Sequence, residues 1–345
     1  MLRVLVLIGF SIFSSQTLAA PEALLEANWD HLIDQPWQQC KTGEFQDELV
    51  PSKSIAYRRC GGVGSMRPVI IVPGYTEPAM KYVELMSDLS SRLPQLGPWY
   101  LLDLPGQGAS ERLVDTKGID QRLVHVDIPD RYPQSVVTLV KKIILPENKK
   151  NHPLAVSHST GALVLMAALR QSPDLIRAAV MTAPLIKPKM PLPQFVVAEL
   201  AAIHCRLGFC AYTAWGRAPE AIQEKTFEKN VSTSSKARWS ASHRIGIKYP
   251  GYYSSGTTWG WLNMAMILGR EVASAENPMG SQVLMLMAED DSYIDPPAAI
   301  EACKKSKACT FEFMGKSRHE IFHEIDSIRD KALEKVARFF GANVR

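Results

Sequence analysis

Short apolar runs alternate with longer amphipathic stretches along most of the chain. A short, continuously apolar run is typical of a strand that is buried on both faces, and the longer stretches repeat their apolar positions with a helical period. This alternation predicts strands at 68–72, 99–103, 154–156, 177–182, 282–287 and 310–314, and helices at 80–93, 134–145, 161–170, 297–305 and 320–340. Strands and helices that alternate in this way indicate a parallel sheet with helices on both faces.

Two segments depart from the alternation. Before the first buried strand, residues 22–32 predict a short helix and residues 44–57 predict a β-hairpin. Between residues 185 and 278 the chain has helical apolar stretches, no clear strand, and many Pro, Trp and Tyr residues. We therefore expect one doubly wound α/β core, made of residues 21–184 and 279–345, that is interrupted by a helical cap at 185–278.

The first residues have the pattern of a secretory signal peptide. Arg3 is a minimal basic start, residues 4–13 are apolar, and small residues at 17–20 suit a signal peptidase. The apolar segment is short for a membrane span, and no later stretch is long and apolar enough to cross a bilayer. We expect residues 1–20 to be removed and the protein to be exported, as a periplasmic or secreted protein. An uncleaved anchor is the alternative.

The cysteines agree with export. All of them follow the expected signal peptide, in three close pairs: Cys40 and Cys60, Cys205 and Cys210, Cys303 and Cys309. An even number in an exported chain indicates disulfides, and neighbour pairing is the simplest of roughly 15 connectivities. No pair has the C-x-x-C spacing of a zinc or redox motif. Free buried thiols in a reducing compartment are the alternative.

The net charge says little about the binding partners of the protein. A formal charge of +4 gives no reason to expect a nucleic-acid partner. The charge is compatible with peripheral contact at an anionic membrane surface but does not require it. The sequence gives no indication of the oligomeric state.

Residues 154–165 carry the first sign of chemistry. A short buried strand runs into Ser157-His158-Ser159-Thr160-Gly161 and then into a helix of small and apolar residues. This is the strand–turn–helix context of a G-x-S-x-G nucleophile elbow, whose sharp turn needs small residues on either side of the serine. Gly161 meets that demand, and Ser157 replaces the first glycine. Ser159 is therefore the candidate nucleophile, and a serine-rich turn without chemistry is the alternative.

A serine nucleophile needs a base, and the base needs an orienting carboxylate. In α/β-hydrolases the chain order is serine, acid, histidine, each placed after a strand. Asp290, Asp291 and Asp295 follow the predicted strand 282–287, and His319 follows the next strand. A chance arrangement would rarely place all three residue types in this order after successive predicted strands.

Stabilising the tetrahedral intermediate requires two backbone N–H groups that point at the developing oxyanion. Thr160 follows the nucleophile directly and would supply one of them. Tyr75 follows Pro73-Gly74 at the end of an early predicted strand and would supply the other.

Together these motifs resemble those of the α/β-hydrolases that include bacterial lysophospholipases and monoacylglycerol lipases. The resemblance runs from about Trp37 to the C-terminus. The matching stretches are 73–77 (H-G-x-x-E in the family), 103–110 (D-x-x-G-x-G-x-S), His125-Val126 with Tyr132, 157–161 (G-H-S-x-G), 288–295 (G-E-D-x-x-V-D) and 319–321 (H-E-I). The cap segment 212–264 is also similar to that of bacterial membrane-associated lysophospholipases. The chain departs from the family pattern at Pro73 and Ser157.

The resemblance implies an enzyme that cleaves carboxylic esters through an acyl-enzyme on Ser159, with His319 as the base. The family spacing assigns the acid to Asp291 in preference to Asp290 and Asp295. The implied substrate is a single-chain lipid, a lysophospholipid or a monoacylglycerol, and no cofactor or metal is implied. A general carboxylesterase, a peptidase or an acyltransferase on the same fold is the alternative. A catalytically inactive protein that uses the same fold only for binding is a further alternative.

Residues 319–323 also spell H-E-x-x-H, a zinc protease motif. Zinc binding would need both histidines on one face of a helix. We expect His319 in the loop before the last helix, so the zinc interpretation is rejected and His323 is expected to be a packing or surface residue.

Aromatic and apolar residues are frequent in the expected cap. Trp215, Trp239, Trp259 and Trp261, together with residues 195–197, would suit the lining of a tunnel for an acyl chain. Ordinary packing inside the cap is the alternative.

Overall fold

The computed structural model describes residues 21–62, 66–114, 118–216, 218–277 and 279–344. The expected signal peptide, residues 1–20, lies outside these described residues. Within them, no helix combines the length and the apolar character that a membrane span requires.

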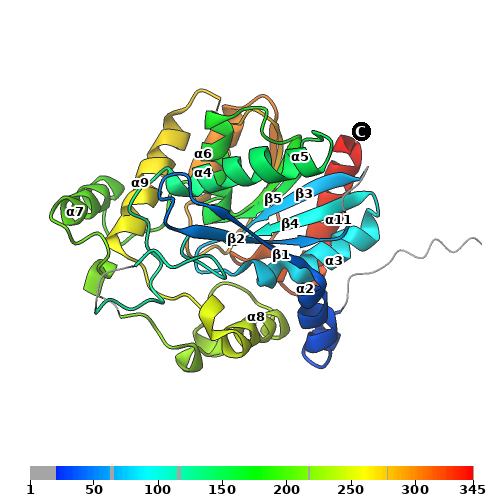
Figure 1. Ribbon diagram of the computed structural model, residues 1–345, viewed down its shortest axis with the longest axis horizontal. Helices are drawn as coiled ribbons and strands as arrows, with labels where there is room; N and C mark the ends of the chain where they lie inside the picture. The colour runs from blue at the N-terminus through cyan, green and yellow to red at the C-terminus, as the bar shows by residue number, and fades with distance from the viewer. Residues whose placement is uncertain (1–20, 63–65, 115–117, 217, 278, 345) are drawn as a thin grey trace, which may run out of the picture.

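A mostly parallel sheet forms the centre of the molecule (Figure 1). Its strands are β1 Lys41–Gln46, β2 Ser54–Cys60, β3 Arg67–Val72, β4 Leu96–Leu102, β5 Leu154–His158, β6 Ala178–Thr182, β7 Gln282–Met287 and β8 Cys309–Phe313. In the described part of the chain, these eight strands lie in the order β1-β2-β4-β3-β5-β6-β7-β8. The β1–β2 and β2–β4 pairs are antiparallel and the other pairs are parallel. The predicted hairpin and the predicted strands are confirmed.

Helices cover both faces of this sheet. The α-helices of the described residues are α1 Glu22–Leu25, α2 Gln35–Gln39, α3 Val83–Arg92, α4 Arg131–Thr138, α5 Leu145–Glu147, α6 Thr160–Gln171, α7 Gln194–Arg206, α8 Lys236–Lys248, α9 Trp259–Ser274, α10 Pro296–Lys304 and α11 Asp326–Asn343. One apolar layer joins a face of the sheet to α4, α6, α9 and α10, and a second joins the opposite face to α3 and α11. The expected doubly wound α/β architecture is confirmed.

Strand β3 shows why its sequence is apolar without a break. Ile70 and Val72 belong to one apolar layer, whereas Val69 and Ile71 belong to the other, and all four are buried. A central parallel strand with helices on both sides has no solvent-facing residues along its buried length, so positions 69–72 are all apolar.

Two predicted helices have different limits in the structure. The segment 22–32 contains only α1 as an α-helix, followed by a π-helical turn at Asp30–Asp34 and then by α2. The last helix begins at Asp326 and not at residue 320. The carboxylate of Glu324 accepts N–H groups from Arg318 and Ile325, which folds this segment into a turn before the helix can start.

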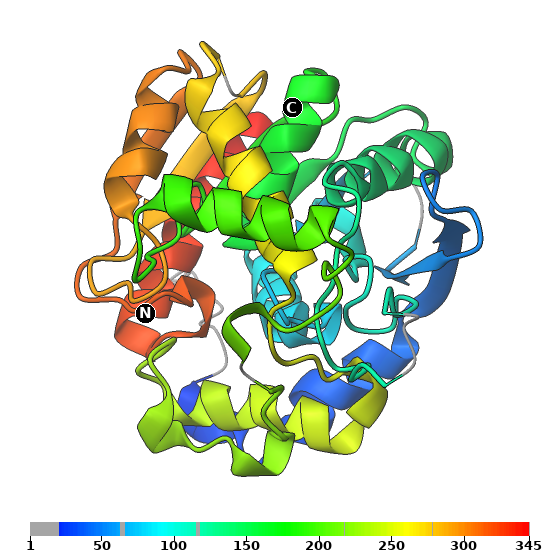
Figure 2. The same ribbon diagram turned by 90° about the vertical axis from the view of Figure 1, so that its left-hand side faces the viewer.

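The segment between β6 and β7 contains α7, α8 and α9. Figure 2 shows α7 crossing over α9, with α8 on the lower side of the molecule. Helix α9 packs against α7 and also against α6 of the core, whereas α8 packs against α1. Because α9 contacts both parts, the division into a core and a cap at 185–278 stays a prediction.

The cysteines pair as neighbours along the chain. The structure joins Cys40 to Cys60, Cys205 to Cys210, and Cys303 to Cys309, and leaves no free cysteine among the described residues. The Cys40–Cys60 bond closes the hairpin of β1 and β2, because Cys40 precedes β1 and Cys60 ends β2. This pairing fits the expectation of disulfides in the mature protein.

We expect mass spectrometry of unreduced, alkylated protein to find no alkylated cysteine and to find these three linked peptide pairs. Replacing Cys40 and Cys60 together with Ser should lower the free energy of unfolding by about 3 kcal/mol, since the bond closes a loop with a sequence separation of 20 residues. Urea unfolding under non-reducing conditions measures the difference. Six alkylated cysteines in the unreduced protein would contradict the pairing.

Candidate active site

The residues selected from the sequence converge at one edge of the sheet. Ser159 follows β5, Asp291 follows β7, His319 follows β8, and Tyr75 follows β3. The carboxyl ends of parallel strands meet at the same edge, which is where open α/β sheets bind their ligands. The parallel pairing of these strands therefore brings together residues that lie far apart in the sequence.

Ser159 occupies a sharp turn between β5 and α6. Its backbone has φ 51° and ψ −117°, a conformation that side-chain-bearing residues rarely adopt. Two residues later, a Cβ atom on Gly161 would lie 2.3 Å from the carbonyl oxygens of both Val72 and Pro73. Only glycine fits at this point. Ser157 stands where the motif has its first glycine; it is buried, and its hydroxyl has no hydrogen-bond partner among the described residues.

Ser159, His319 and Asp291 form a continuous hydrogen-bonded chain. The Ser159 hydroxyl lies 2.9 Å from Nε2 of His319, and Nδ1 of His319 lies 2.6 Å from Oδ2 of Asp291. Because the ionised carboxylate can only accept, Nδ1–H donates to Asp291, and the Ser159 hydroxyl can then donate to Nε2. All three side chains are buried.

Asp291 is held in the orientation that this chain of bonds requires. Its Oδ1 accepts the backbone N–H groups of Tyr293 and Ile294 at 2.8 and 3.1 Å. Burial alone would raise the pKa of Asp291, but the hydrogen bond from His319 and these N–H donors lower that pKa below its ordinary value. The competing carboxylates lie elsewhere: Asp290 is exposed, and Asp295 pairs with Lys187.

The loop of residues 73–77, here called the oxyanion loop, is tied down on both sides of Tyr75. The Gly74 N–H donates to Oε2 of Glu77 at 2.6 Å, and the Thr76 N–H donates to Oε1 of Gln107 at 2.6 Å. The Tyr75 side chain is also fixed, because its hydroxyl lies 2.6 Å from Oγ1 of Thr257. Tyr75 and Thr160 both line the same cavity as Ser159.

Asp103 organises the turn that supports this loop. Its carboxylate accepts the N–H groups of Ala79 and Ala109, and a Cβ atom on Gly108 would lie only 1.8 Å from Oδ1 of Asp103. Burial raises the pKa of Asp103 to about 6 in spite of these donors. The D-x-x-G-x-G-x-S stretch of the sequence is therefore structural in this protein.

The sequence analysis missed a buried ionic cluster beside the site. The ammonium group of Lys81 lies 2.6 Å from Oε1 of Glu77 and 2.7 Å from Oε2 of Glu320, and the Tyr82 hydroxyl donates to Glu77. The four-residue spacing of Glu77 and Lys81 is a recognisable local signal for an ion pair. The approach of Glu320 comes from a distant part of the chain and has no local signal.

Two further histidines lie near His319 but have other partners. Nδ1 of His158 lies 3.0 Å from Oγ1 of Thr182, and burial lowers the pKa of His158 to about 3, so this ring stays neutral. His323 is buried, and its Nε2 lies 3.1 Å from the carbonyl oxygen of Lys81. His319 and His323 therefore have different hydrogen-bond partners. The described residues hold no cluster of three or more His, Cys, Asp or Glu arranged for a metal ion.

A cavity of about 620 Å³ opens above Ser159. Three of the tryptophans expected to line it do so: Trp215, Trp239 and Trp261. The expectation is not met for Trp259, whose indole stacks on His204 at a centroid distance of 4.0 Å. Residues 195–197 are not in the lining either, because they lie on α7, where Phe195 is 73% exposed.

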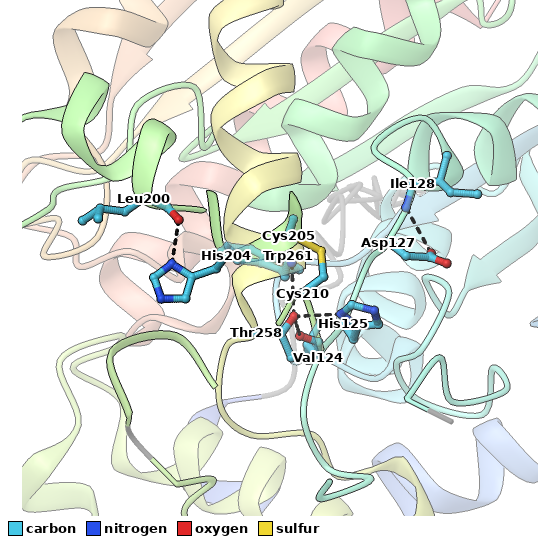
Figure 3. The surroundings of a disulfide bond; sticks show 10 residues. All are labelled: Val124, His125, Asp127, Ile128, Leu200, His204, Cys205, Cys210, Thr258 and Trp261. Atoms are coloured by element: carbon cyan, nitrogen blue, oxygen red, sulfur yellow. Dashed lines mark hydrogen bonds between the residues drawn. A yellow bond between two sulfur atoms is a disulfide. The ribbon is translucent and has the colours of Figure 1, made fainter. Parts of the chain in front are cut away.

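The start of α9 fixes the tryptophan next to the oxyanion loop. Oγ1 of Thr258 accepts the backbone N–H of Trp261 and also lies 3.1 Å from Nδ1 of His125. Figure 3 shows these contacts beside the Cys205–Cys210 disulfide. The Trp261 ring lies against the Tyr75 ring, with centroids 4.3 Å apart. This part of the cavity wall and the oxyanion loop are therefore packed as one unit.

Known proteins with similar sequences include enzymes that act on lipids. The chain is 27% identical over 321 residues to a protein described as lysophospholipase L2 from Escherichia coli, a match that covers 88% of each chain. Residues 65–326 match the family model described as serine aminopeptidase, S33.

Solved structures with the same fold include lipases and esterases. A soluble variant of monoglyceride lipase from Saccharomyces cerevisiae, in complex with a substrate analogue, superposes with a TM-score of 0.66 at 15% identity, over 88% of this chain and 95% of that one. A carboxyl esterase from Bacillus coagulans, in complex with glycerol, gives a TM-score of 0.68 at 12% identity, over 89% and 99%. The family model covers most of the chain, and the resemblance seen in the sequence motifs is confirmed. The chain belongs to the serine aminopeptidase S33 family of α/β-hydrolases.

Proposed function

We propose that the protein is a serine hydrolase that cleaves the carboxylic ester of a single-chain lipid, a lysophospholipid or a monoacylglycerol. The observation that carries this proposal is the bonded chain from Asp291 through His319 to Ser159, at the floor of a cavity. This is the arrangement by which an imidazole, oriented by a carboxylate, activates a serine hydroxyl.

The reaction would proceed in two halves. His319 takes the Ser159 proton while Oγ attacks the ester carbonyl carbon, and the oxyanion that forms is held by the backbone N–H groups of Tyr75 and Thr160. His319 then gives its proton to the leaving alcohol, which leaves an acyl group on Ser159. Water, deprotonated by the same imidazole, hydrolyses the acyl-enzyme and releases the fatty acid.

The cavity supports a substrate with one apolar chain. Its volume lies within the range of roughly 300–1,000 Å³ that is typical of small-molecule sites. Leu185, Met190, Trp215, Trp261 and Leu262 give it apolar walls next to Ser159. The names of similar proteins, a lysophospholipase and a monoglyceride lipase, point to the same class of substrate.

A peptidase on the same fold fits the cavity less well. An aminopeptidase must bind the free amino group of its substrate, for which a carboxylate is the suitable partner. The carboxylates in the cavity wall are those of Glu77 and Glu320, and both are engaged by Lys81. A general carboxylesterase remains the nearest alternative, and acyl-chain preference separates it from a lipase.

We also propose that the protein is exported and acts at a membrane surface. The signal-like start of the sequence and the three paired cysteines support export. Large apolar side chains on and after α7 face solvent: Phe195, Ile203, Leu207, Phe209, Tyr212 and Trp215. Trp215 also lines the cavity. Arg206 is exposed at the end of α7, and Lys189, whose ammonium group donates to the carbonyl oxygen of Asp291, is exposed before that helix. An apolar helix face flanked by basic residues is typical of interfacial binding to anionic lipid.

Ser159→Ala should abolish measurable ester hydrolysis because the nucleophile is lost. The expected decrease in kcat is up to about 10⁶-fold. Ser157→Ala, in the same turn, is the matched control and should stay close to wild type, since its hydroxyl has no partner. Hydrolysis of a lysophospholipid and labelling by a fluorophosphonate probe measure both variants. Substantial activity in Ser159→Ala would show that another residue is the nucleophile.

Asp291→Asn should lower kcat by about 10⁴-fold, because the amide no longer holds the His319 ring in the required tautomer. Asp295→Asn is the control for the competing acid and should have little effect, since Asp295 pairs with the exposed Lys187. Steady-state kinetics on a soluble ester distinguish the two. The reverse order of effects would assign the acid to Asp295.

The value of kcat/KM should rise with acyl-chain length and then level off when the cavity is full. Each buried methylene contributes about 0.8 kcal/mol, or roughly fourfold in binding. Two-chain phospholipids should be poor substrates, because the second chain would remain in water. A series of monoacylglycerols and lysophospholipids from short to long chains measures this dependence. Equal or better kcat/KM on acetyl or butyryl esters would favour a general short-chain esterase.

Phe195→Asp combined with Leu207→Asp should weaken binding to vesicles of phosphatidylcholine and phosphatidylglycerol. Hydrolysis of a monomeric short-chain ester should be unchanged, because neither residue lines the cavity. Ile247→Asp is the control, since Ile247 is also a large exposed apolar residue but lies on α8. Vesicle co-sedimentation provides the measurement. Unchanged vesicle binding in the double variant would remove α7 as the membrane-contacting helix.

A further inference from the structure

Lys81 lies between the two loops that carry the proposed oxyanion donor and the proposed base. It is in the 3₁₀ turn Ala79–Tyr82 after the oxyanion loop, and its side chain is almost fully buried. Its ammonium group contacts two carboxylates, those of Glu77 and Glu320, at 2.6 and 2.7 Å. An ammonium group is compact and carries several donors, so it can bridge two carboxylates at once.

Each of these carboxylates is adjacent to a proposed catalytic group. Glu77 ends the oxyanion loop, and its Oε2 accepts the N–H of Gly74, the residue directly before Tyr75. Glu320 directly follows His319, in the turn of residues 318–325, here called the histidine loop. The Glu320 backbone N–H is itself bonded to the carbonyl oxygen of Ser232. Lys81 therefore joins the loop of the proposed oxyanion donor to the loop of the proposed base.

We propose that Lys81 is a positioning residue that holds the oxyanion loop and the histidine loop in their relative places by binding Glu77 and Glu320 at the same time. The inference rests on the proposed function, because it assigns Tyr75 and His319 their roles in ester hydrolysis. Lys81 acts through these two loops, without taking or giving a proton.

The charges and the packing of the cluster agree with this role. Burial alone would lower the pKa of Lys81, but Glu320 and Glu77 raise it above its usual value, so the bridge keeps its positive charge. The pKa of Glu77 is well below its usual range because of the Lys81 ammonium group and despite burial, so it stays ionised. A Cβ atom on Gly74 would lie 2.7 Å from Oε2 of Glu77, which shows how closely the carboxylate holds the loop.

Loss of the ammonium group would leave the buried carboxylate of Glu77 and the partly buried carboxylate of Glu320 without their shared cation. Removing one partner of a buried ion pair leaves an uncompensated charge, which is strongly unfavourable. Glu77 would take up a proton or turn away, and the peptide between Pro73 and Gly74 would lose the acceptor of its N–H group. The next peptide, which carries the Tyr75 N–H, would lose this support on its N-terminal side. The donor aimed at the oxyanion would then be misplaced, although the acyl-binding walls of the cavity would be intact.

The test compares Lys81→Met with Lys81→Arg. Lys81→Met should lower kcat per titrated active site by about 10²- to 10³-fold, the effect of losing one oxyanion donor, and should leave KM within about threefold because uniform binding is retained. Lys81→Arg keeps a cation that can bind both carboxylates and should recover most of the lost kcat. Active sites are titrated with a fluorophosphonate, so unfolded protein does not enter the rate.

Arg131→Met provides the matched control. Arg131 is as buried as Lys81 and also binds two carboxylates, those of Asp47 and Asp127, but none of the three lines the cavity. This variant should lower the melting temperature without changing kcat per active site. A merely structural role for Lys81 would give the same result as Arg131→Met.

Glu320→Gln tests the same bridge if Lys81→Met does not fold, because the amide keeps the size of the side chain and removes only its charge. We expect kcat per active site to fall by about tenfold with little change in KM. An unchanged kcat in Glu320→Gln or in a folded Lys81→Met would overturn the inference. If Ser159→Ala also stayed active, the proposed function itself would fail, so the two failures are distinguishable.

Discussion

The close approach of the Ser159 turn to the end of β3 constrains the rest of the site. A Cβ atom at Gly161 would lie 2.3 Å from the carbonyl oxygens of Val72 and Pro73, so α6 can start only against this backbone if residue 161 is glycine. The same contact fixes the position of the oxyanion loop relative to Ser159. One glycine thus allows two backbone segments to pack tightly enough for Ser159 and Tyr75 to face the same cavity.

Each buried ionised group discussed at this edge of the sheet has its own hydrogen-bond or ion-pair partners. Asp291 accepts two backbone N–H groups and a bond from His319, and Lys81 balances Glu77 and Glu320. A buried charge without such partners would be strongly destabilising. These contacts also fix orientation, because both carboxylate oxygens of Asp291 and of Glu77 have specified donors. The electrostatic requirement of folding and the geometric requirement of the proposed reaction are met by the same bonds.

The segment between β6 and β7 connects the sheet to the proposed substrate. Its helix α9 carries Trp261, which packs on Tyr75 of the oxyanion loop, while Trp215 lies both on the cavity wall and at the surface. The Cys205–Cys210 bond ties the end of α7 to Cys210, whose carbonyl oxygen accepts the Gly260 N–H in the first turn of α9. An acyl chain that enters beside Trp215 would therefore approach Ser159 along a wall that the core itself holds in place.

The sequence alone predicted what depends on local pattern. The unbroken apolar runs of the central strands and the small residues around Ser159 predicted the sheet and the serine turn, since both are set by steric and hydrophobic demands within a few residues. The order of serine, aspartate and histidine after successive strands pointed to the side chains that the structure brings into hydrogen-bonding distance. Contacts between distant segments were decided only by the tertiary structure. The approach of Glu320 to Lys81 and the outward position of Phe195 both depend on how separate elements pack, and no local spacing encodes that packing.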